Sequence, residues 1–255
     1  MVQTYHPRKI IIWDDNFFVN LNRVNAFLDE YIKKKYTFDW WAHSRADTFA
    51  KEDKKFLKRL RQCNCRCISM GAESGSPRIL KLIKKHIIPS DILASCKNIS
   101  KYGILPDYSV ISGFPGETVA DLYQTLNLIQ KIIEINPNTG LRLYNFFPLP
   151  GTPILEECVK YGFVYPDTMC DWSIYEFYSY IAPWLTKKHQ KLIKSIIWIT
   201  AFVSPKTKPT AGRWYVDLLL EFLHYDAKWR LRHNFYSLAF EWIIFYSLYK
   251  RHYKT

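Results

Sequence analysis

The sequence contains no apolar run of the roughly 18–20 residues that a membrane-spanning helix needs. The longest candidate, residues 236–249, is interrupted by Glu241. No signal peptide is evident, because the first nine residues lead directly into a short apolar run at residues 10–13. Low-complexity stretches and obvious linkers are also absent before residue 165. These absences favour a cytoplasmic protein with reduced thiols and no transmembrane segment.

Charge and composition narrow the class of partner. The chain has 255 residues, of which 48% are hydrophobic, enough for one large domain or a domain with an appendage. Its formal net charge is +13, which is consistent with nucleic acid, an anionic lipid surface or a phosphorylated substrate as partner. The alternative is a basic solvated surface with no specific partner, and composition alone leaves both interpretations open.

Short apolar segments alternate with amphipathic segments over the first 150 residues. The apolar segments predict strands at residues 9–13, 38–42, 63–70, 104–111 and 141–147. The amphipathic segments predict helices at residues 21–35, 51–61, 89–102 and 119–135, with a further helix beginning at Ser76-Pro77. Thr118 and Asp121 have the spacing of a capping box at the start of the last of these helices. This alternation predicts an α/β fold with a parallel sheet and right-handed crossovers.

The last third of the chain has a different composition. From Asp171 onward, many aromatic residues are interleaved with Lys and Arg, and helical spacing is present at residues 187–203 and 212–249. We therefore expect an α/β domain at residues 1–165 and a helical C-terminal region at residues 166–255. Core packing of a helical cap is the default interpretation. Contact with a membrane surface and stacking on nucleic acid are the alternatives, although no nucleic-acid-binding motif accompanies them.

Polar runs that contain Gly or Pro follow four of the predicted strands. They read WDDNFF (13–18), MGAESGS (70–76), SGFPGET (112–118) and FFPLPGTP (146–153). In α/β folds with parallel strands, the loops that follow the strands lie on one edge of the sheet or barrel, where binding and catalytic residues gather. The sequence therefore predicts a functional site at this edge.

Five short motifs carry a resemblance to a known family. They are Asp14-Asp15-Asn16-Phe17, Arg45-Ala46-Asp47, Gly71-Ala72-Glu73-Ser74-Gly75-Ser76, Gly113-Phe114-Pro115-Gly116-Glu117-Thr118 and Pro150-Gly151-Thr152-Pro153. In this order, over about residues 8–165, they resemble the radical S-adenosylmethionine (SAM) superfamily. The branch most similar is the cobalamin-associated one, with its anaerobic porphyrin cyclase-like and methyltransferase-like enzymes. The resemblance implies a partial parallel (β/α) barrel with about five of six βα units.

The same resemblance implies cofactors and a reaction. In that family, a 4Fe–4S cluster binds S-adenosylmethionine and cleaves it reductively, and the resulting 5′-deoxyadenosyl radical abstracts hydrogen from a substrate. Cobalamin is implied only for the full-length members of the branch. The substrate and the type of reaction are not indicated, and no catalytic residue is assigned.

The resemblance also implies which residues bind S-adenosylmethionine. The residues implied are Asp14, Asp15, Asn16, Arg45, Glu73, Ser74, Gly113, Phe114, Pro115, Gly116, Glu117, Phe147 and Pro148. The first three would face the ammonium group, and Arg45 would pair with the ligand carboxylate. Glu73 and Ser74 would bind the ribose or the methionine end, the Gly113–Glu117 turn would lie beside adenine and ribose, and Phe147 with Pro148 would line the adenine.

A structural role remains open for each of these groups. The carboxylates of Asp14 and Asp15 could cap the next helix, and Arg45 could pair with Asp47 or Asp15. Glu73 and Ser74 could have a helix-capping role ahead of Pro77. The glycine-containing turn could be an ordinary strand-to-helix connection, and the Pro-rich run could provide only rigidity.

The cluster-binding motif of the family, C-x3-C-x2-C, is absent from this sequence. Because the first strand resembles the second strand of the family, we expect the cluster loop, and any cobalamin domain, upstream of Met1 or on a separately encoded fragment. Cys63, Cys65 and Cys67 form a C-x-C-x-C run that we place within a strand, facing one side. Packing is therefore favoured over metal or redox chemistry for these three thiols. Cys96, Cys158 and Cys170 are expected to be structural.

Three functions remain open. The first is a radical SAM enzyme whose cluster-binding segment is not in this chain, so that the chain alone is inactive. The second is a non-catalytic remnant or SAM-binding subunit that acts with a partner. The third is a basic protein that binds a membrane surface or nucleic acid through its C-terminal third.

Overall fold

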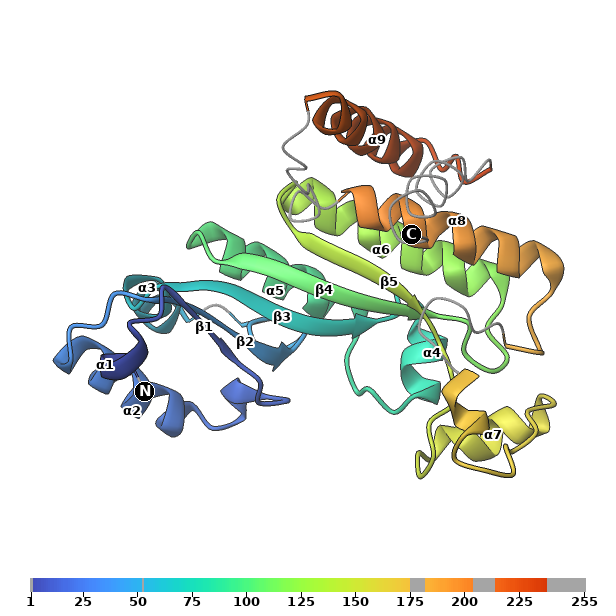
Figure 1. Cartoon of the computed structure of the whole chain (residues 1–255), viewed down its shortest axis with the longest axis horizontal. Helices are drawn as coiled ribbons and strands as arrows, with labels where there is room; N and C mark the ends of the chain where they lie inside the picture. The colour runs from blue at the N-terminus through green and yellow to red at the C-terminus, as the bar shows by residue number, and fades with distance from the viewer. Residues whose placement is uncertain (1, 52, 175–181, 204–213, 238–255) are drawn as a thin grey trace, which may run out of the picture. The chain divides into compact units, whose positions relative to one another are not determined.

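The five strands form one parallel sheet in the order β1-β2-β3-β4-β5 (Figure 1). The computed structural model describes residues 2–51, 53–174, 182–203 and 214–237. The strands are β1 (Lys9–Ile12), β2 (Asp39–Arg45), β3 (Cys65–Glu73), β4 (Leu105–Ser112) and β5 (Gly140–Asn145). The predicted α/β class with five parallel strands is confirmed.

Helices separate the strands in the order that the sequence predicts. The helices are α1 (Val2–Tyr5), η1 (Phe17–Val19), α2 (Leu21–Lys33), α3 (Lys54–Gln62), α4 (Pro77–Leu82), α5 (Pro89–Lys101), α6 (Val119–Ile135), α7 (Ile154–Lys160), η2 (Asp171–Ile174), α8 (Lys187–Val203) and α9 (Trp214–Arg232). Within the described residues, no helix is both long enough and apolar enough to cross a bilayer.

The chain divides into two compact units that interleave along the sequence. The first unit consists of residues 1–72, 86–109 and 131–140, and the second of residues 73–85, 110–130 and 141–255. Strands β3, β4 and β5 and helix α6 contribute residues to both units. The domain boundary that the sequence suggests near residue 165 falls inside the second unit and stays a prediction.

The first unit is built on the parallel pairing of β1, β2 and β3. Ile12 of β1 is in register with Ala42 of β2, and Arg45 of β2 with Gly71 of β3. Trp40 is buried on the helix-covered face, where its indole Nε1 donates a hydrogen bond to the Cys63 carbonyl at 2.6 Å. Buried polar side chains of this kind are normally hydrogen-bonded, so this bond fixes the position of the large ring.

The placement of Cys63 within a strand is wrong. Cys63 is the C-cap residue of α3, and β3 begins only at Cys65. Asn64 lies between them with φ +58° and lets the chain reverse from helix to strand. Cys63, Cys65 and Cys67 are all buried, but the three do not form one alternating row on a strand.

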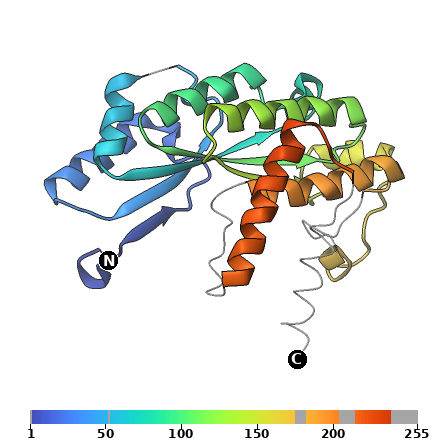
Figure 2. The same ribbon diagram turned by 90° about the horizontal axis from the view of Figure 1, so that it is seen from above.

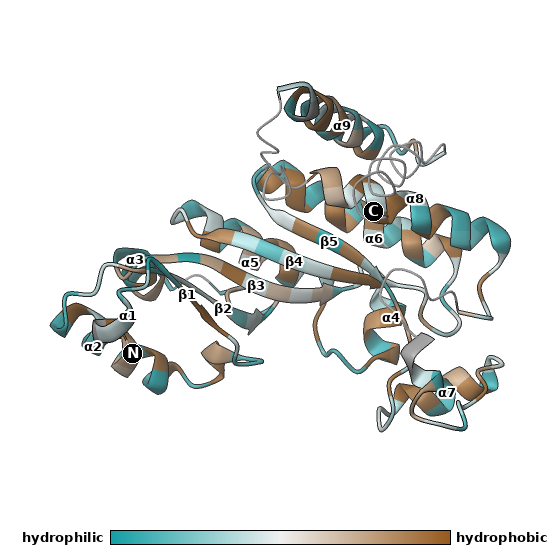
Figure 3. Cartoon of the chain, viewed as in Figure 1, coloured by the Kyte–Doolittle hydropathy of each residue, from teal (hydrophilic) through white to brown (hydrophobic). Residues whose placement is uncertain are grey.

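The second unit has its own hydrophobic core around the segments that follow β4 and β5. Its buried cluster consists of Ile79, Phe114, Phe146, Leu155, Cys158 and Phe163. The rings of Phe114 and Phe146 lie 4.9 Å apart, centroid to centroid. Helix α9 packs across α8, and both helices carry many apolar residues (Figures 2 and 3).

Local capping explains where α4 and α6 begin. Ser76 caps α4 by accepting a hydrogen bond from the Ile79 amide, and Pro77 occupies the first helical turn. At α6 the predicted capping box is confirmed, since the Thr118 hydroxyl accepts from the Asp121 amide at 3.2 Å and the Asp121 carboxylate accepts from the Thr118 amide at 2.9 Å. These caps fix the start of both helices beside the polar runs that follow β3 and β4.

Candidate functional site

The polar run after β4 folds into a tight turn that leads into α6. Gly113 and Gly116 have φ angles of +98° and +68°, a region that residues with a Cβ rarely adopt. The Glu117 amide donates to the Phe114 carbonyl at 3.0 Å and closes the turn. The Phe114 side chain points into the core of the second unit, and within the turn only Gly116 and Thr118 are partly or fully exposed.

Glu117 is buried beneath this turn, with a residue exposure of 7%. Its Oε2 accepts hydrogen bonds from the Ser112 hydroxyl at 2.8 Å and from the Gly113 amide. Burial raises the pKa of the Glu117 carboxyl to about 7, although the bonds from Gly113 and Ser112 favour the charged form. Hydrogen bonds to the Glu117 carboxyl therefore connect the start of the turn, at Ser112 and Gly113, to its end.

A second carboxylate, Asp121, holds the outer side of the same turn. It accepts hydrogen bonds from the Ser76 hydroxyl at 2.6 Å and from the Arg78 guanidinium, and Arg78 also donates to the Gly116 carbonyl at 2.7 Å. Burial opposes ionisation of Asp121, but the hydrogen bonds from Arg78, Ser76 and Thr118 outweigh it and lower the pKa of this carboxyl. Hydrogen bonds thus connect the turn to the first residues of α4.

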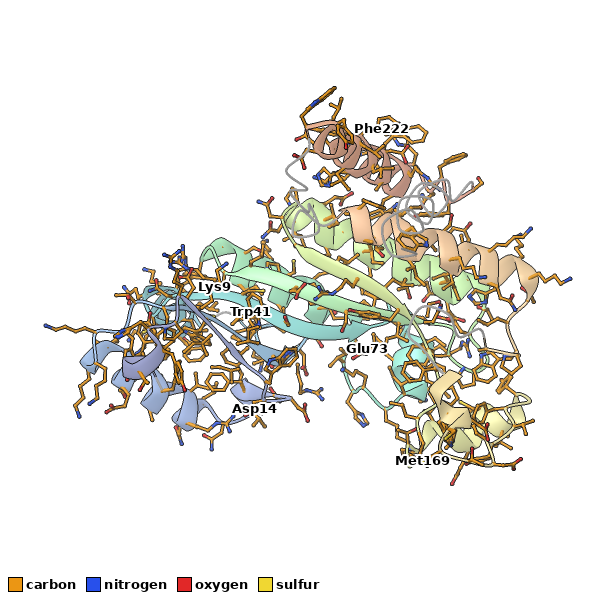
Figure 4. The ribbon with its side chains drawn as sticks, viewed as in Figure 1. Lys9, Asp14, Trp41, Glu73, Met169 and Phe222 are labelled. Atoms are coloured by element: carbon orange, nitrogen blue, oxygen red, sulfur yellow. The ribbon has the colours of Figure 1, made fainter. Side chains whose placement is uncertain are left out.

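Glu73 and Ser74 lie where β3 ends. Glu73 is the last residue of β3 and has φ +59°, an uncommon conformation for a residue other than glycine (Figure 4). Its carboxylate binds the Lys85 ammonium group at 2.7 Å. The Ser74 hydroxyl is fully buried and lies 3.0 Å from the Thr125 hydroxyl. The suggestion that Glu73 caps α4 does not apply, because Ser76 fills that role.

A small pocket lies beside the turn in the second unit. It is lined by Ser112, Asn145, Phe146, Ala182, Leu185, Gln190, Ile193 and Lys194. The aromatic and aliphatic side chains form apolar walls, while the hydroxyl, amide and ammonium groups supply hydrogen-bonding partners. Small-molecule sites usually combine apolar walls with a few polar groups, in a volume of about 300–1,000 Å³. The interior of this pocket is about 10 Å³, room for about one water molecule, so its side chains would have to move to admit a larger ligand. Phe146, rather than the predicted Phe147, lines this pocket, and the neighbouring Pro148 is buried.

The residues predicted after β1 and β2 belong to the first unit. Asp14 Oδ2 accepts a hydrogen bond from Arg23 of α2 at 2.7 Å (Figure 4 marks Asp14), while the side chain of Asp15 is exposed. Helix α2 is capped by Asn20, so neither carboxylate is its N-cap. The amide oxygen of Asn16 is buried and has no hydrogen-bond partner among the described residues.

Arg45 ends β2 and pairs with Asp47 at 3.1 Å, which is one of the two partners that the sequence suggests. The rings of Trp13 and His43 lie 5.3 Å apart. His43 Nε2 is buried without a hydrogen-bond partner among the described residues. Buried polar atoms of this kind usually have a partner, so those of Asn16 and His43 are candidates to contact a ligand.

The cysteines do not fit an iron–sulfur cluster. Among the described residues, no three His, Cys, Asp or Glu side chains are grouped so that they could hold a metal ion. Burial raises the pKa of the Cys63 and Cys65 thiols, which disfavours the thiolate that a cluster requires. Cys96 and Cys158 are also buried, in keeping with a structural role, whereas Cys170 is exposed.

Several residues of the site escape prediction from sequence. Arg78, Asn145, Phe146, Trp184, His189 and Lys194 contact the turn, its supporting carboxylates or the pocket. The side chains from the C-terminal region are more than 65 residues away from the turn in sequence, and no motif marks them. Only the spacing of Thr118 and Asp121 gave a local signal for part of this network.

Comparison with known proteins identifies relatives of part of the chain. Residues 19–129 match the model of the Radical SAM superfamily. An uncharacterized methyltransferase of Pyrococcus horikoshii is 30% identical over 149 residues, which are 56% of this chain and 32% of that protein. The chain therefore matches about a third of the length of this relative.

Two solved structures are similar in fold. The cobalamin-dependent S-adenosylmethionine radical enzyme OxsB, with aqua-cobalamin bound, matches with a TM-score of 0.60 and 14% identity over 98% of this chain and 44% of that chain. The radical S-adenosylmethionine methyltransferase TsrM from Kitasatospora setae, with cobalamin and a 4Fe–4S cluster bound, has a TM-score of 0.52 and 18% identity over 62% of this chain and 32% of that chain. At these identities the likeness concerns the fold.

Proposed function

Residues 19–129 match the Radical SAM superfamily model, and we propose that this chain is the part of a radical SAM protein that binds the cosubstrate S-adenosylmethionine. The observation that carries this proposal is the turn from Ser112 to Thr118 beside a small pocket. Ser112, at the start of the turn, lines the pocket, and two buried carboxylates hold the shape of the turn.

The pocket suggests how the nucleoside end would bind. Phe146, Leu185 and Ile193 offer apolar contact to a planar base, and Ser112 and Asn145 lie beside them as polar partners. Gly116, the partly exposed glycine of the turn, is proposed to let the backbone approach the ribose, while Gly113 and Pro115 are buried behind it. In this proposal no ligand contact is assigned to Phe114, Glu117 or Ser74. Their side chains are buried and already packed or hydrogen-bonded, so they stabilise the segments around the pocket.

Glu73 lies at the end of β3, and we assign it to the ribose hydroxyls. The residues of the first unit stay predictions from the resemblance, Asp14, Asp15 and Asn16 for an ammonium group and Arg45 for a carboxylate. The unpaired amide oxygen of Asn16 supports this prediction.

Iron–sulfur chemistry requires ligands from outside this sequence, because the described cysteines do not fit a cluster. We propose that a cluster-binding segment, and cobalamin if it is used, are supplied by further sequence or by a partner. The exposed edge position of β1 in the sheet would allow a further parallel strand to pair there. Methyl transfer is the reaction class proposed for the assembled protein, in line with the description of the Pyrococcus horikoshii relative.

Binding of S-adenosylmethionine to the purified chain, measured by isothermal titration calorimetry, tests the proposal. Without a cluster we expect a weak complex, with a dissociation constant on the order of 0.1–1 mM. Gly113→Ala should weaken it, whereas Gly162→Ala should not, although both glycines have positive φ. The proposal fails if the wild-type chain shows no saturable binding, or if the two variants bind equally.

A non-catalytic binding subunit is the second candidate, and the lack of fitting cysteine ligands favours it for the isolated chain. Anaerobic reconstitution with iron and sulfide tests this second candidate. Stoichiometric cluster incorporation with release of 5′-deoxyadenosine would exclude the non-catalytic candidate. The location of the protein in the cytoplasm remains part of the proposal.

A further inference from the structure

The C-terminal region contacts the turn directly in the second unit. The Trp184 indole Nε1 donates a hydrogen bond to the Gly113 carbonyl at 3.0 Å. A Cβ on Gly113 would lie 3.3 Å from Leu185 Cδ1, so the aliphatic side chain packs closely against the glycine. The Trp184 ring also lies 6.2 Å from the ring of Phe146, which lines the pocket. The first glycine of the turn is therefore enclosed by residues that precede α8.

His189 of α8 reaches the other end of the same turn. Its Nε2 lies 3.8 Å from Glu117 Oε2, and both side chains are at most 4% exposed. Among the described residues, neither His189 Nε2 nor Glu117 Oε1 has a hydrogen-bond partner. The distance of 3.8 Å exceeds that of a hydrogen bond, and Oε2 already accepts from Ser112 and Gly113. A small movement of the buried imidazole would bring Nε2 within hydrogen-bond distance of this carboxyl.

The turn depends on such outside contacts for its shape. Gly113 and Gly116 are conformationally permissive, so fixing them in a single conformation costs more entropy than fixing other residues. The bond from Trp184 to the Gly113 carbonyl and the buried position of His189 beside Glu117 restrict the turn at both ends. Restricting a binding loop in its bound shape raises affinity without any new contact to the ligand.

We propose that Trp184 and His189 are positioning residues that hold the turn from Gly113 to Glu117 in its ligand-binding shape. The C-terminal helical region then sets the affinity of the cosubstrate pocket, in addition to forming one of its walls through Gln190 and Lys194. This inference rests on the proposed binding of S-adenosylmethionine.

Titration of Glu117 gives the proposal a pH dependence. The charged groups around this carboxyl are Asp121 of α6 and Arg78 of α4, and His189 of α8 faces it as a titratable group. The ionised carboxylate is the stronger acceptor for the Gly113 amide and the Ser112 hydroxyl. Since the pKa of Glu117 is raised to about 7, ligand affinity should fall as the pH drops below about 7.

Calorimetric titration with S-adenosylhomocysteine, which carries no reactive sulfonium, tests the positioning role. Trp184→Phe should weaken binding about tenfold, the size expected for the loss of one hydrogen bond in a buried site. His189→Ala should weaken binding by a similar factor, because it removes the buried side chain that faces Glu117. His189→Gln should retain most of the affinity, because its amide can donate from a position close to that of Nε2. Lys188→Gln, at the exposed position next to His189, and Trp214→Phe, at an exposed position on α9, are the controls and should bind like wild type.

The pH dependence of ligand affinity distinguishes a positioning role of these residues from a general contribution to stability. Wild type should lose affinity below about pH 7, and Glu117→Gln should not show this loss. Equal loss of affinity in His189→Gln and His189→Ala, or an unchanged pH profile in Glu117→Gln, would overturn the inference.

Hydrogen exchange of the ligand-free protein tests whether Trp184 and His189 anchor the turn, independently of whether any ligand binds. Amides of residues 113–118 should exchange faster in His189→Ala and Trp184→Phe than in wild type, while those of β5 stay unchanged. If wild type binds no ligand but the exchange result holds, the proposed function fails and the anchoring of the turn stands. If the ligand binds but exchange and affinity are unchanged in both variants, the positioning role is wrong.

Discussion

At the scale of single residues, two buried carboxylates with opposite pKa shifts support the turn. Burial raises the pKa of Glu117 to about 7, although its Oε2 accepts two hydrogen bonds. Burial also lowers the pKa of the neighbouring His189, which disfavours a positive charge beside this carboxyl. Asp121 is held ionised by Arg78, Ser76 and Thr118. The two side chains should therefore respond to pH in opposite directions.

For Glu117, we predict that stability falls as the pH rises. The folded state keeps the proton up to about pH 7, whereas an unfolded glutamate loses it near pH 4.5. This contribution to stability is complete below about pH 4.5 and is lost between there and pH 7, at up to about 1.4 kcal/mol per pH unit. Urea unfolding of wild type and Glu117→Gln across this range measures it. An identical slope in the two proteins would contradict the prediction.

For Asp121, the prediction concerns its partner Arg78. Arg78→Gln removes donors from a carboxylate that is only 6% exposed, so the free energy of unfolding should fall by about 1–3 kcal/mol. Because the pKa of Asp121 is lowered, the difference between wild type and variant should shrink as the pH falls below about 4. Lys81→Gln, an exposed position on the same helix, is the control and should change stability by less than about 0.5 kcal/mol.

At the scale of secondary structure elements, Gly75 sets how closely the segment after β3 approaches α6. A Cβ on Gly75 would lie 2.7 Å from the Thr125 Cα and would overlap the Gln124 carbonyl oxygen. Both obstacles are backbone atoms, so α6 would have to move. The hydrogen bond from the Gly75 amide to the Thr125 hydroxyl, 2.9 Å long, would be strained as well.

We expect Gly75→Ala to lower the free energy of unfolding by about 2–4 kcal/mol. Gly151→Ala is the matched control. Its φ is +77° but no atom lies within 4 Å of an added Cβ, so it should cost only about 1 kcal/mol. Thermal unfolding of both variants measures the difference, and a smaller loss in Gly75→Ala than in Gly151→Ala would refute this account of the contact.

The sequence predicts the elements better than the details at their ends. The strand-and-helix alternation and the capping box of Thr118 follow from local patterns, and both are confirmed. The sequence misplaces Cys63 because the alternation of Cys65 and Cys67 in β3 extends back to Cys63, at the end of α3. At the end of β5, the pattern could not tell whether Phe146 or Phe147 faces the pocket, since a shift of one residue reverses the face.

At the scale of the whole molecule, the pocket combines residues from distant parts of the sequence. Ser112, Phe146 and Lys194 line it together, and Trp184 and His189 brace the turn beside it. Tertiary packing alone brings the C-terminal residues to this place, which is why no local pattern predicts them. The resemblance of the strand-end motifs to the radical SAM superfamily identified the turn, but not what holds it.

The cysteines lead to a prediction for the intact chain. Anaerobic reconstitution with iron and sulfide should leave it without a stoichiometric 4Fe–4S cluster, because Cys63 and Cys65 are buried thiols with raised pKa values. Iron and sulfide analysis after gel filtration measures the content. Four iron atoms per chain, lost in Cys63→Ser, would show that these residues do ligate a cluster.

Binding of S-adenosylmethionine by the turn at residues 113–118 can be measured by hydrogen exchange of the wild-type chain with and without saturating ligand. We expect slower exchange in the complex for the amides of residues 113–118 and for the pocket-lining segment at Asn145 and Phe146. Unchanged exchange in this turn, or protection confined to other parts of the chain, would contradict it.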